Sequence, residues 1–197
     1  MIQKAKGTYD VFGTYGKRLL YVEELIEGLM EKYNYEYVRT PIFESSELFH
    51  RGVGVTTDIV TKETYDFTDR GNRNMTLRPE GTAGVVRSYV ENKMYANPGL
   101  AKVYYCGPMF RHERPQAGRF RQFTQFGVEV FGDESPLLDA DTINMCYLML
   151  KEIGIQARQD IEEFLGKQVF LETHVKTIED WRDKEKYLIE FGLKEIN

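Results

Sequence analysis

The segment QFTQFGVEV, residues 122–130, constrains the fold most, because its side chains alternate between two unlike faces. One face is predicted to enter the core: Thr124, Phe126, Val128 and Val130. The other face combines an aromatic ring, an amide, a residue without a side chain and a carboxylate: Phe123, Gln125, Gly127 and Glu129. A solvated sheet face would explain a lone strand of this kind. The preceding strand, however, carries Met109, Arg111 and Glu113 at alternate positions and can pair with it, which favours the floor of a ligand pocket.

The other patterns predict an α+β fold with an antiparallel sheet. Helices are expected at residues 17–33, 45–51 and 80–94, the first because apolar residues recur at helical spacing. Strand-like runs occupy residues 35–44, 64–68, 74–78, 101–106, 107–113 and 122–130. Pro41 has no amide donor, so its strand should lie at an edge or an interface. The turn-rich residues 69–73 should close a hairpin.

Charge in this 197-residue chain is acidic overall but locally basic. A net charge of −5 argues against non-specific binding to polyanions. Arginines nevertheless cluster in one predicted loop, opposed by Glu113: Arg111, Arg114, Arg119 and Arg121. No Walker-type glycine loop is present, so guanidinium groups would have to hold the phosphates of a nucleotide, with Phe123 stacking on a purine. Glu80 has two open interpretations, a carboxylate that complements a helix dipole or a site residue.

Several classes of protein are not indicated. No run of about 18 apolar residues and no signal-like N-terminus is present, so we expect a cytoplasmic protein without a membrane segment. Cys106 and Cys146 lie 40 positions apart without a CxxC pattern, and the chain has only three histidines. We therefore expect neither a disulfide framework nor a protein metal site, and we interpret both cysteines as buried small apolar residues.

Longer strings resemble the class II aminoacyl-tRNA synthetases, and among them the histidine-tRNA ligases, over residues 1 to about 154. These strings are KGTYD, TLRPEGT and GPMFRHERPQAGRFRQF. The last resembles motif 2, the ATP-holding strand–loop–strand, and YVRTPIFE, residues 37–44, resembles motif 1. The resemblance implies a class II catalytic core at residues 1–150 and a homodimer formed through the motif 1 segment.

The resemblance also implies a site that activates L-histidine with ATP and Mg²⁺ and transfers it to tRNA(His). Arg111 would be catalytic, stabilising charge at the α-phosphate. The ATP-binding residues would be Arg111, Glu113, Arg119, Arg121 and Phe123. The histidine-binding residues would be Glu80, Gly81, Thr82, Gln125 and Glu129.

Other family segments have no counterpart here, namely the LVRGLDYY-like and GGGRYDGL-like segments, motif 3 and the anticodon-binding domain. We therefore expect a truncated core that is poorly active alone. Residues 151–197 instead resemble the end of the RNA-binding KH domain of the GTPase Era, as if two sequences were joined at MLKEIG, but without its GxxG loop. The alternatives are a non-catalytic protein that binds ribosomal RNA through this tail and a regulatory synthetase paralogue.

Overall fold

The computed structural model describes residues 2–51, 63–112 and 119–154. The chain divides into two compact units. The first unit comprises Met1–Arg18 and Asn34–Gly132, and the second comprises Leu19–Tyr33 and Asp133–Asn197. Helix α1 (Gly13–Lys32) begins in the first unit and continues in the second.

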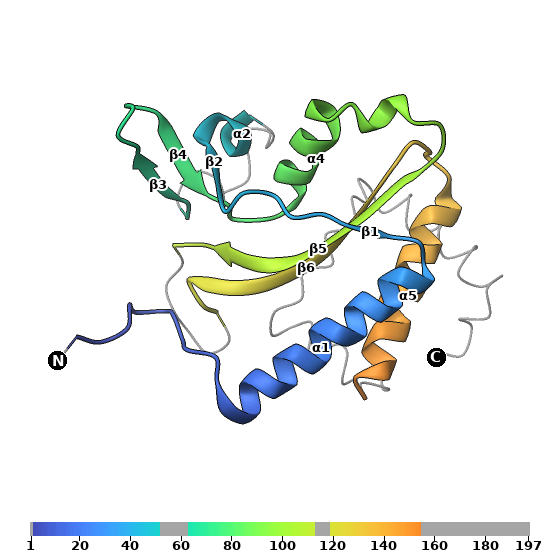
Figure 1. Ribbon diagram of the computed structural model, residues 1–197, viewed down its shortest axis with the longest axis horizontal. Helices are drawn as coiled ribbons and strands as arrows, with labels where there is room; N and C mark the ends of the chain where they lie inside the picture. Colours follow the sequence, from blue (N-terminus) through green and yellow to red (C-terminus); the bar gives the residue numbers. More distant parts are fainter. Residues whose placement is uncertain (1, 52–62, 113–118, 155–197) are drawn as a thin grey trace, which may run out of the picture. The chain divides into compact units, whose positions relative to one another are not determined.

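The first unit contains a sheet in which two long strands run side by side (Figure 1). Its strands, in the order β1-β5-β6, are β1 (Glu36–Tyr37), β5 (Ala101–Phe110) and β6 (Gln122–Phe131). β5 and β6 are antiparallel, as predicted, whereas β1 pairs with β5 in parallel. The separate strands expected at residues 101–106 and 107–113 are one strand that ends at Phe110. This long pairing brings Tyr105 opposite Gly127 and Met109 opposite Phe123.

A second, antiparallel sheet in the same unit has the order β2-β4-β3. Its strands are β2 (Phe43–Ser45), β4 (Asn74–Leu77) and β3 (Tyr65–Thr68). The predicted hairpin is confirmed, and its turn is held by Asp69, whose carboxylate accepts from the backbone amides of Gly71 and Arg73. The single strand expected at residues 35–44 is wrong. Pro41 lies between β1 and β2, which belong to different sheets.

The described residues of the first unit also include the short helical segments α2 (Ser46–Arg51), α4 (Thr82–Glu91) and the 3₁₀ turn η1 (Met94–Ala96). The helix predicted over residues 80–94 is thus shorter, and Lys93 between its two parts has a left-handed φ of 53°. An α-helix cannot continue through that conformation.

The second unit pairs the rest of α1 with α5 (Pro136–Glu152). Ser135 caps α5, with Pro136 at the first helical position, where a missing amide costs nothing. Asn144 of α5 donates to the Tyr33 hydroxyl at 3.2 Å. Among the described residues, no helix is long and apolar enough to cross a membrane.

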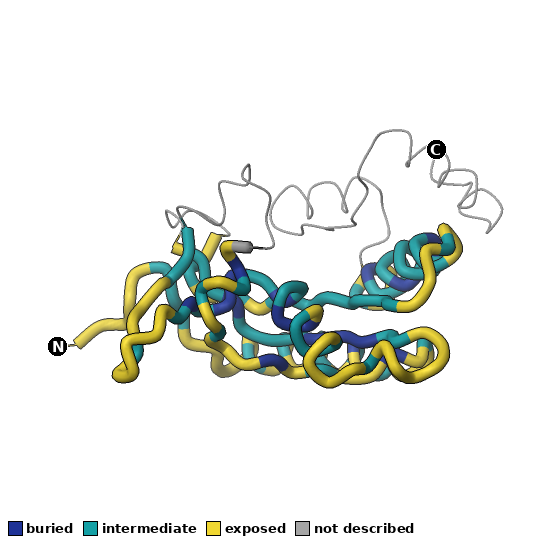
Figure 2. The backbone as a smooth tube through the Cα atoms, turned by 90° about the horizontal axis from the view of Figure 1, so that it is seen from above, coloured by how far each residue is buried: buried dark blue, intermediate teal, exposed yellow. Residues whose placement is uncertain are grey.

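The packed core of the first unit lies on the face of β6 that was predicted to be an open pocket floor. Val85 of α4 packs with three residues of β5, namely Val103, Tyr105 and Met109. These three stand opposite Glu129, Gly127 and Phe123 in the β5–β6 register. The face predicted to enter the core is packed to a similar extent: Phe126, Val128 and Val130 are half-buried, as are the residues of the first face, whereas Thr124 is exposed. Figure 2 shows how buried, half-buried and exposed residues are distributed along the described backbone.

Candidate active site

Tyr105 fills the gap that two glycines leave above the sheet. A Cβ added to Gly127 would lie 2.3 Å from both Cζ and Oη of Tyr105, and one added to Gly81 would lie 2.2 Å from Cε2. Gly81 stands at the start of α4, while Gly127 lies in the middle of β6. The tyrosine ring therefore occupies the space between helix and strand, and the gap that the sequence suggested for a ligand is filled by the chain itself.

Two of the predicted histidine-binding side chains meet beside this ring. The Thr82 hydroxyl donates to Glu129 Oε1 at 2.7 Å, joining the first residue of α4 to β6. Because a hydrogen bond to a carboxylate fixes its orientation, Glu129 is held in place before any ligand arrives.

Glu80 caps the same helix. Its Oε1 accepts from the backbone amide of Ala83 at 3.0 Å, and its Oε2 accepts from that of Thr82. The interpretation of Glu80 as a carboxylate that complements the helix dipole is therefore confirmed. A carboxylate has about four lone-pair positions, so these two bonds leave capacity for a further donor.

Gln125 presents an unsatisfied acceptor. Its Oε1 is buried and has no hydrogen-bond partner among the described residues. Gln125 stands opposite Gly107 on β5, where no side chain can cover it. A buried amide oxygen without a donor is unfavourable, so this position suits a ligand that carries an N–H group.

Arg111 is anchored by contacts that leave its terminal amino groups aside. Its Nε donates to the Pro79 carbonyl at 2.9 Å, and its Cζ lies 5.2 Å from the ring centroid of Phe123. Within the described part of the chain, no hydrogen bond engages Nη1 or Nη2. An arginine fixed in this way can present both amino groups to one phosphate.

Arg78 is a supporting residue that the sequence interpretation missed. It is buried, and it donates to the carbonyls of Thr40 and Pro108, both at 2.9 Å. Burial lowers the pKa of this guanidinium. Its backbone carbonyl accepts from Phe110, so it ties the segment before Glu80 to the end of β5. Arg78 is part of the string TLRPEGT, which could have signalled this role only through the resemblance.

The arginine loop is described in part. Glu113 and Arg114 lie outside the described residues. Arg119 is exposed, whereas Arg121 is half-buried and accepts the Arg111 amide at its carbonyl, at 3.0 Å. Thus Arg111 and Arg121 lie together at the end of the β5–β6 pair.

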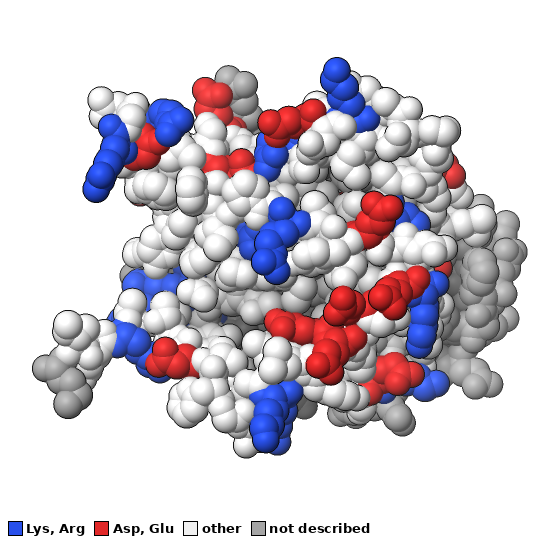
Figure 3. All heavy atoms as spheres, viewed as in Figure 1, with Lys and Arg blue, Asp and Glu red and all other residues white. Residues whose placement is uncertain are grey.

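The described cysteine and acidic side chains do not gather into a metal site. The described residues contain no group of three or more histidine, cysteine, aspartate or glutamate side chains that could hold a metal ion. Both cysteines are half-buried rather than fully buried, and burial raises the pKa of Cys146 to about 11. On the face in Figure 3, basic and acidic side chains are interspersed, as the net charge suggests.

A family profile described as histidyl-tRNA synthetase matches residues 10–180. The chain belongs to the histidyl-tRNA synthetase family. The histidine–tRNA ligase of Geobacillus sp. (strain WCH70) is 51% identical over 179 residues, which are 90% of this chain and 42% of that protein. The enzyme of Streptococcus pneumoniae (strain JJA) is 58% identical over 158 residues, 79% of this chain and 37% of that protein.

The fold agrees with this assignment. The structure of apo histidyl-tRNA synthetase from S. aureus matches with a TM-score of 0.68 at 44% identity, covering 79% of this chain and 36% of the other. The expected class II, α+β core of the histidyl-tRNA synthetase family is thus confirmed. The chain spans about two fifths of the length of the curated relatives.

The family match also bears on the tail. It extends to residue 180, beyond the boundary expected at residue 150. The comparisons do not support a resemblance of residues 151–197 to the KH domain of Era, and residues 155–197 lie outside the described residues. The RNA-binding alternative that depended on this tail is likewise unsupported.

Proposed function

We propose that this chain carries out the histidine-tRNA ligase reaction, in which histidine is activated with ATP and then transferred to tRNA(His). One arrangement supports the proposal above all. The unsatisfied Gln125 oxygen lies on the β6 face between Phe123, beside the anchored Arg111, and Glu129, held by Thr82. An anion-binding end and a donor-accepting end on one face suit a substrate with a carboxylate and an ammonium group.

At the anion-binding end, Arg111 would bind the α-phosphate of ATP and stabilise the charge that develops as the histidine carboxylate attacks it and pyrophosphate leaves. Phe123 would stack on adenine, and Glu113, Arg119 and Arg121 would surround the nucleotide. Magnesium, when bound, would neutralise phosphate charge. The described residues do not by themselves form a site for this ion.

At the other end, Gln125 and Glu129 would accept N–H groups of histidine, together with Glu80, Gly81 and Thr82 at the start of α4. Because the Tyr105 ring fills the space over Gly127, histidine would lie beside this ring rather than above the glycine. The carboxylates would select the ammonium and imidazole N–H groups by charge-assisted hydrogen bonds.

A homodimer formed through residues 37–44 belongs to the same proposal. Three side chains of this segment are exposed although they are apolar: Tyr37, Ile42 and Phe43. Exposed apolar side chains in this segment support an interface there. A cytoplasmic location follows from the proposed reaction with tRNA.

Histidine-dependent exchange of pyrophosphate into ATP tests the proposal. We expect the chain to catalyse slow exchange, Arg111→Ala to abolish it, and Arg73→Ala to leave it unchanged, because Arg73 pairs with Asp69 in the β3–β4 turn. A chain that neither binds ATP nor catalyses exchange, or an Arg111→Ala variant as active as the parent, would contradict it.

A further inference from the structure

The residues before α1 form a turn that packs against the arginine loop. We call residues 5–9 the N-terminal strap. The Thr8 amide donates to the Ala5 carbonyl at 3.1 Å, and the Thr8 hydroxyl donates to the same oxygen at 2.8 Å. Gly7 takes the third position of this turn with a φ of +84°, as a type II turn requires. The strap therefore has a defined shape, although its residues precede the range matched by the family profile.

Gly7 contacts Arg121 through its backbone carbonyl, and its lack of a side chain leaves room for the side chain of Arg121. Its carbonyl accepts from the Arg121 amide at 2.7 Å. A Cβ on Gly7 would lie 2.8 Å from Cγ, 2.9 Å from Cδ and 3.2 Å from Cβ of Arg121. The near part of the arginine side chain thus lies directly on the face of Gly7, where any other residue would displace it.

A further backbone hydrogen bond links Arg121 to Arg111. The Arg121 amide donates to Gly7, and the Arg121 carbonyl accepts from the Arg111 amide at 3.0 Å. Arg111 in turn donates through Nε to Pro79. The strap, Arg121 and Arg111 therefore form one connected set of backbone contacts.

Tyr9 adds an aromatic contact next to these bonds. Its ring centroid lies 4.5 Å from that of Phe120 and 5.9 Å from that of Tyr15. Phe120 directly precedes Arg121 in the chain. The packing of Tyr9 on Phe120 therefore restrains the same part of the loop as the hydrogen bond between Gly7 and Arg121.

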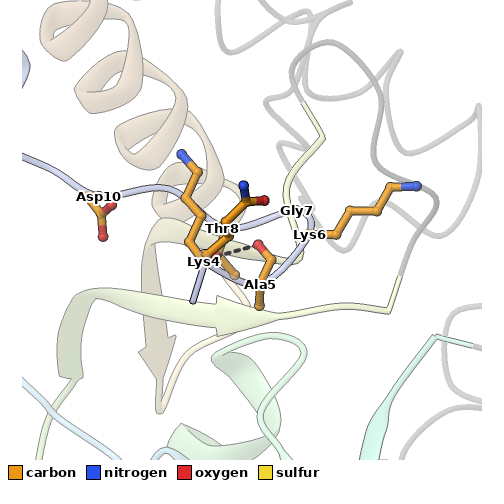
Figure 4. A pocket seen from close by; sticks show the side chains of 7 residues that line it. Lys4, Ala5, Lys6, Gly7, Thr8 and Asp10 are labelled. Carbon is orange, nitrogen blue, oxygen red and sulfur yellow. Dashed lines mark hydrogen bonds between the residues drawn. The ribbon is translucent and has the colours of Figure 1, made fainter. Parts of the chain in front are cut away.

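The hollow over the strap does not look like a ligand site. It has a volume of about 500 Å³ and is lined by Gln3, Lys4, Ala5, Lys6, Gly7, Thr8 and Asp10. Figure 4 shows the Lys4 and Lys6 side chains extending in different directions. Ammonium groups that diverge cannot hold one anion together.

We propose that the N-terminal strap positions Arg121, and through it Arg111, to receive the phosphates of ATP. Gly7 and Tyr9 are then positioning residues that touch no substrate themselves. The inference rests on the proposed function for its ligand. The contacts among Gly7, Arg121 and Arg111 are tested separately below.

The test compares Gly7→Ala with Gly13→Ala in the full chain. Both glycines have a positive φ, so alanine is strained at either, but nothing lies within 4 Å of a Cβ at Gly13. Affinities for Mg-ATP and for histidine are measured by titration calorimetry. Hydrogen exchange followed by mass spectrometry reports on the Arg111 amide.

We expect Gly7→Ala to weaken ATP binding about fivefold, the effect of losing one hydrogen bond, and to speed exchange at Arg111. The affinity for histidine should not change, whereas a general loss of structure would weaken the binding of both ligands. Tyr9→Leu removes the aromatic contact without adding a backbone clash, so it should weaken ATP binding and speed exchange at Arg111 as Gly7→Ala does. Tyr9→Phe keeps the ring and should resemble the parent.

Different results refute the two proposals. Equal ATP affinity and equal exchange at Arg111 in Gly7→Ala and Gly13→Ala would overturn the role of the strap. Loss of affinity for ATP and histidine alike would also overturn it. ATP binding that does not depend on Arg111 would instead refute the proposed function, and exchange at Arg111 would still decide whether the strap controls its backbone.

Discussion

The ring of Tyr105 between Gly81 and Gly127 makes a prediction about stability: Gly127→Ala should destabilise the chain through this ring alone. The added Cβ would meet Cζ and Oη at 2.3 Å and Cε1 at 2.9 Å, whereas ordinary contacts lie at 3.4–4 Å. The ring cannot simply swing away, because Gly81 flanks its other edge and Val85 and Met109 pack in the same cluster.

The magnitude follows from two opposed effects. Overpacking a core costs about 1–3 kcal/mol, and the short distances favour the upper end, about 3 kcal/mol. Replacing a strand glycine by alanine otherwise gains about 0.5–1 kcal/mol. The expected net loss in the free energy of unfolding is therefore about 2 kcal/mol.

Urea unfolding followed by far-UV circular dichroism measures this loss. In a Tyr105→Ala background the clash is absent, so Gly127→Ala should become neutral or mildly stabilising, giving a coupling energy of about 3 kcal/mol in the double-mutant cycle. Gly28→Ala in α1, where a Cβ meets nothing within 4 Å, is the matched control and should stabilise by up to about 1 kcal/mol. A destabilisation by Gly127→Ala that is equal with and without the Tyr105 ring would refute the reasoning.

Three further predictions concern titratable groups. Burial and a hydrogen bond with Tyr15 raise the pKa of Tyr9 from 10.0 to about 12, so its contribution to stability is complete below pH 10 and lost as the pH rises to 12; Tyr9→Phe should flatten this loss in pH-dependent unfolding. Since burial raises the pKa of Cys146 to about 11, its thiol should react slowly with DTNB at pH 8 and quickly in urea. The hydrogen bond from Arg73 lowers the pKa of Asp69, so the stabilising effect of this carboxylate is lost as the pH falls through its lowered pKa. Carboxyl NMR should show that Arg73→Ala raises the pKa of Asp69.

The elements with strong local patterns could be predicted from the sequence. The apolar spacing before residue 33 gave α1, and the turn at residues 69–73 gave the hairpin, because both depend on neighbours along the chain. The alternation in β6 correctly separated its residues into two faces. The expected pairing of the two strands across the loop is confirmed, and Arg111 lies beside Phe123.

That α4 covers the Gly127 face of β6 could not be predicted in the same way. A period of two separates the faces but does not say which one a helix covers. The face that the helix covers depends on Val85 of α4 and on the β5 residues that pack with it. The register of these residues with β6 could not be predicted, because two strands were expected where β5 is one. The sequence pattern of β6 suggested open space over Gly127, whereas in the structure the Tyr105 ring fills this space.

The polar groups on this face differ in how far they are prepared before a ligand binds. Glu80 is oriented by backbone amides and Glu129 by the Thr82 hydroxyl, so neither must reorganise to accept a donor. Gln125 Oε1 is instead buried without a partner among the described residues, which costs about 1–3 kcal/mol in the ligand-free state. A ligand N–H group that reaches this oxygen recovers that cost. The affinity gained at Gln125 is therefore matched by stability that the ligand-free chain forgoes.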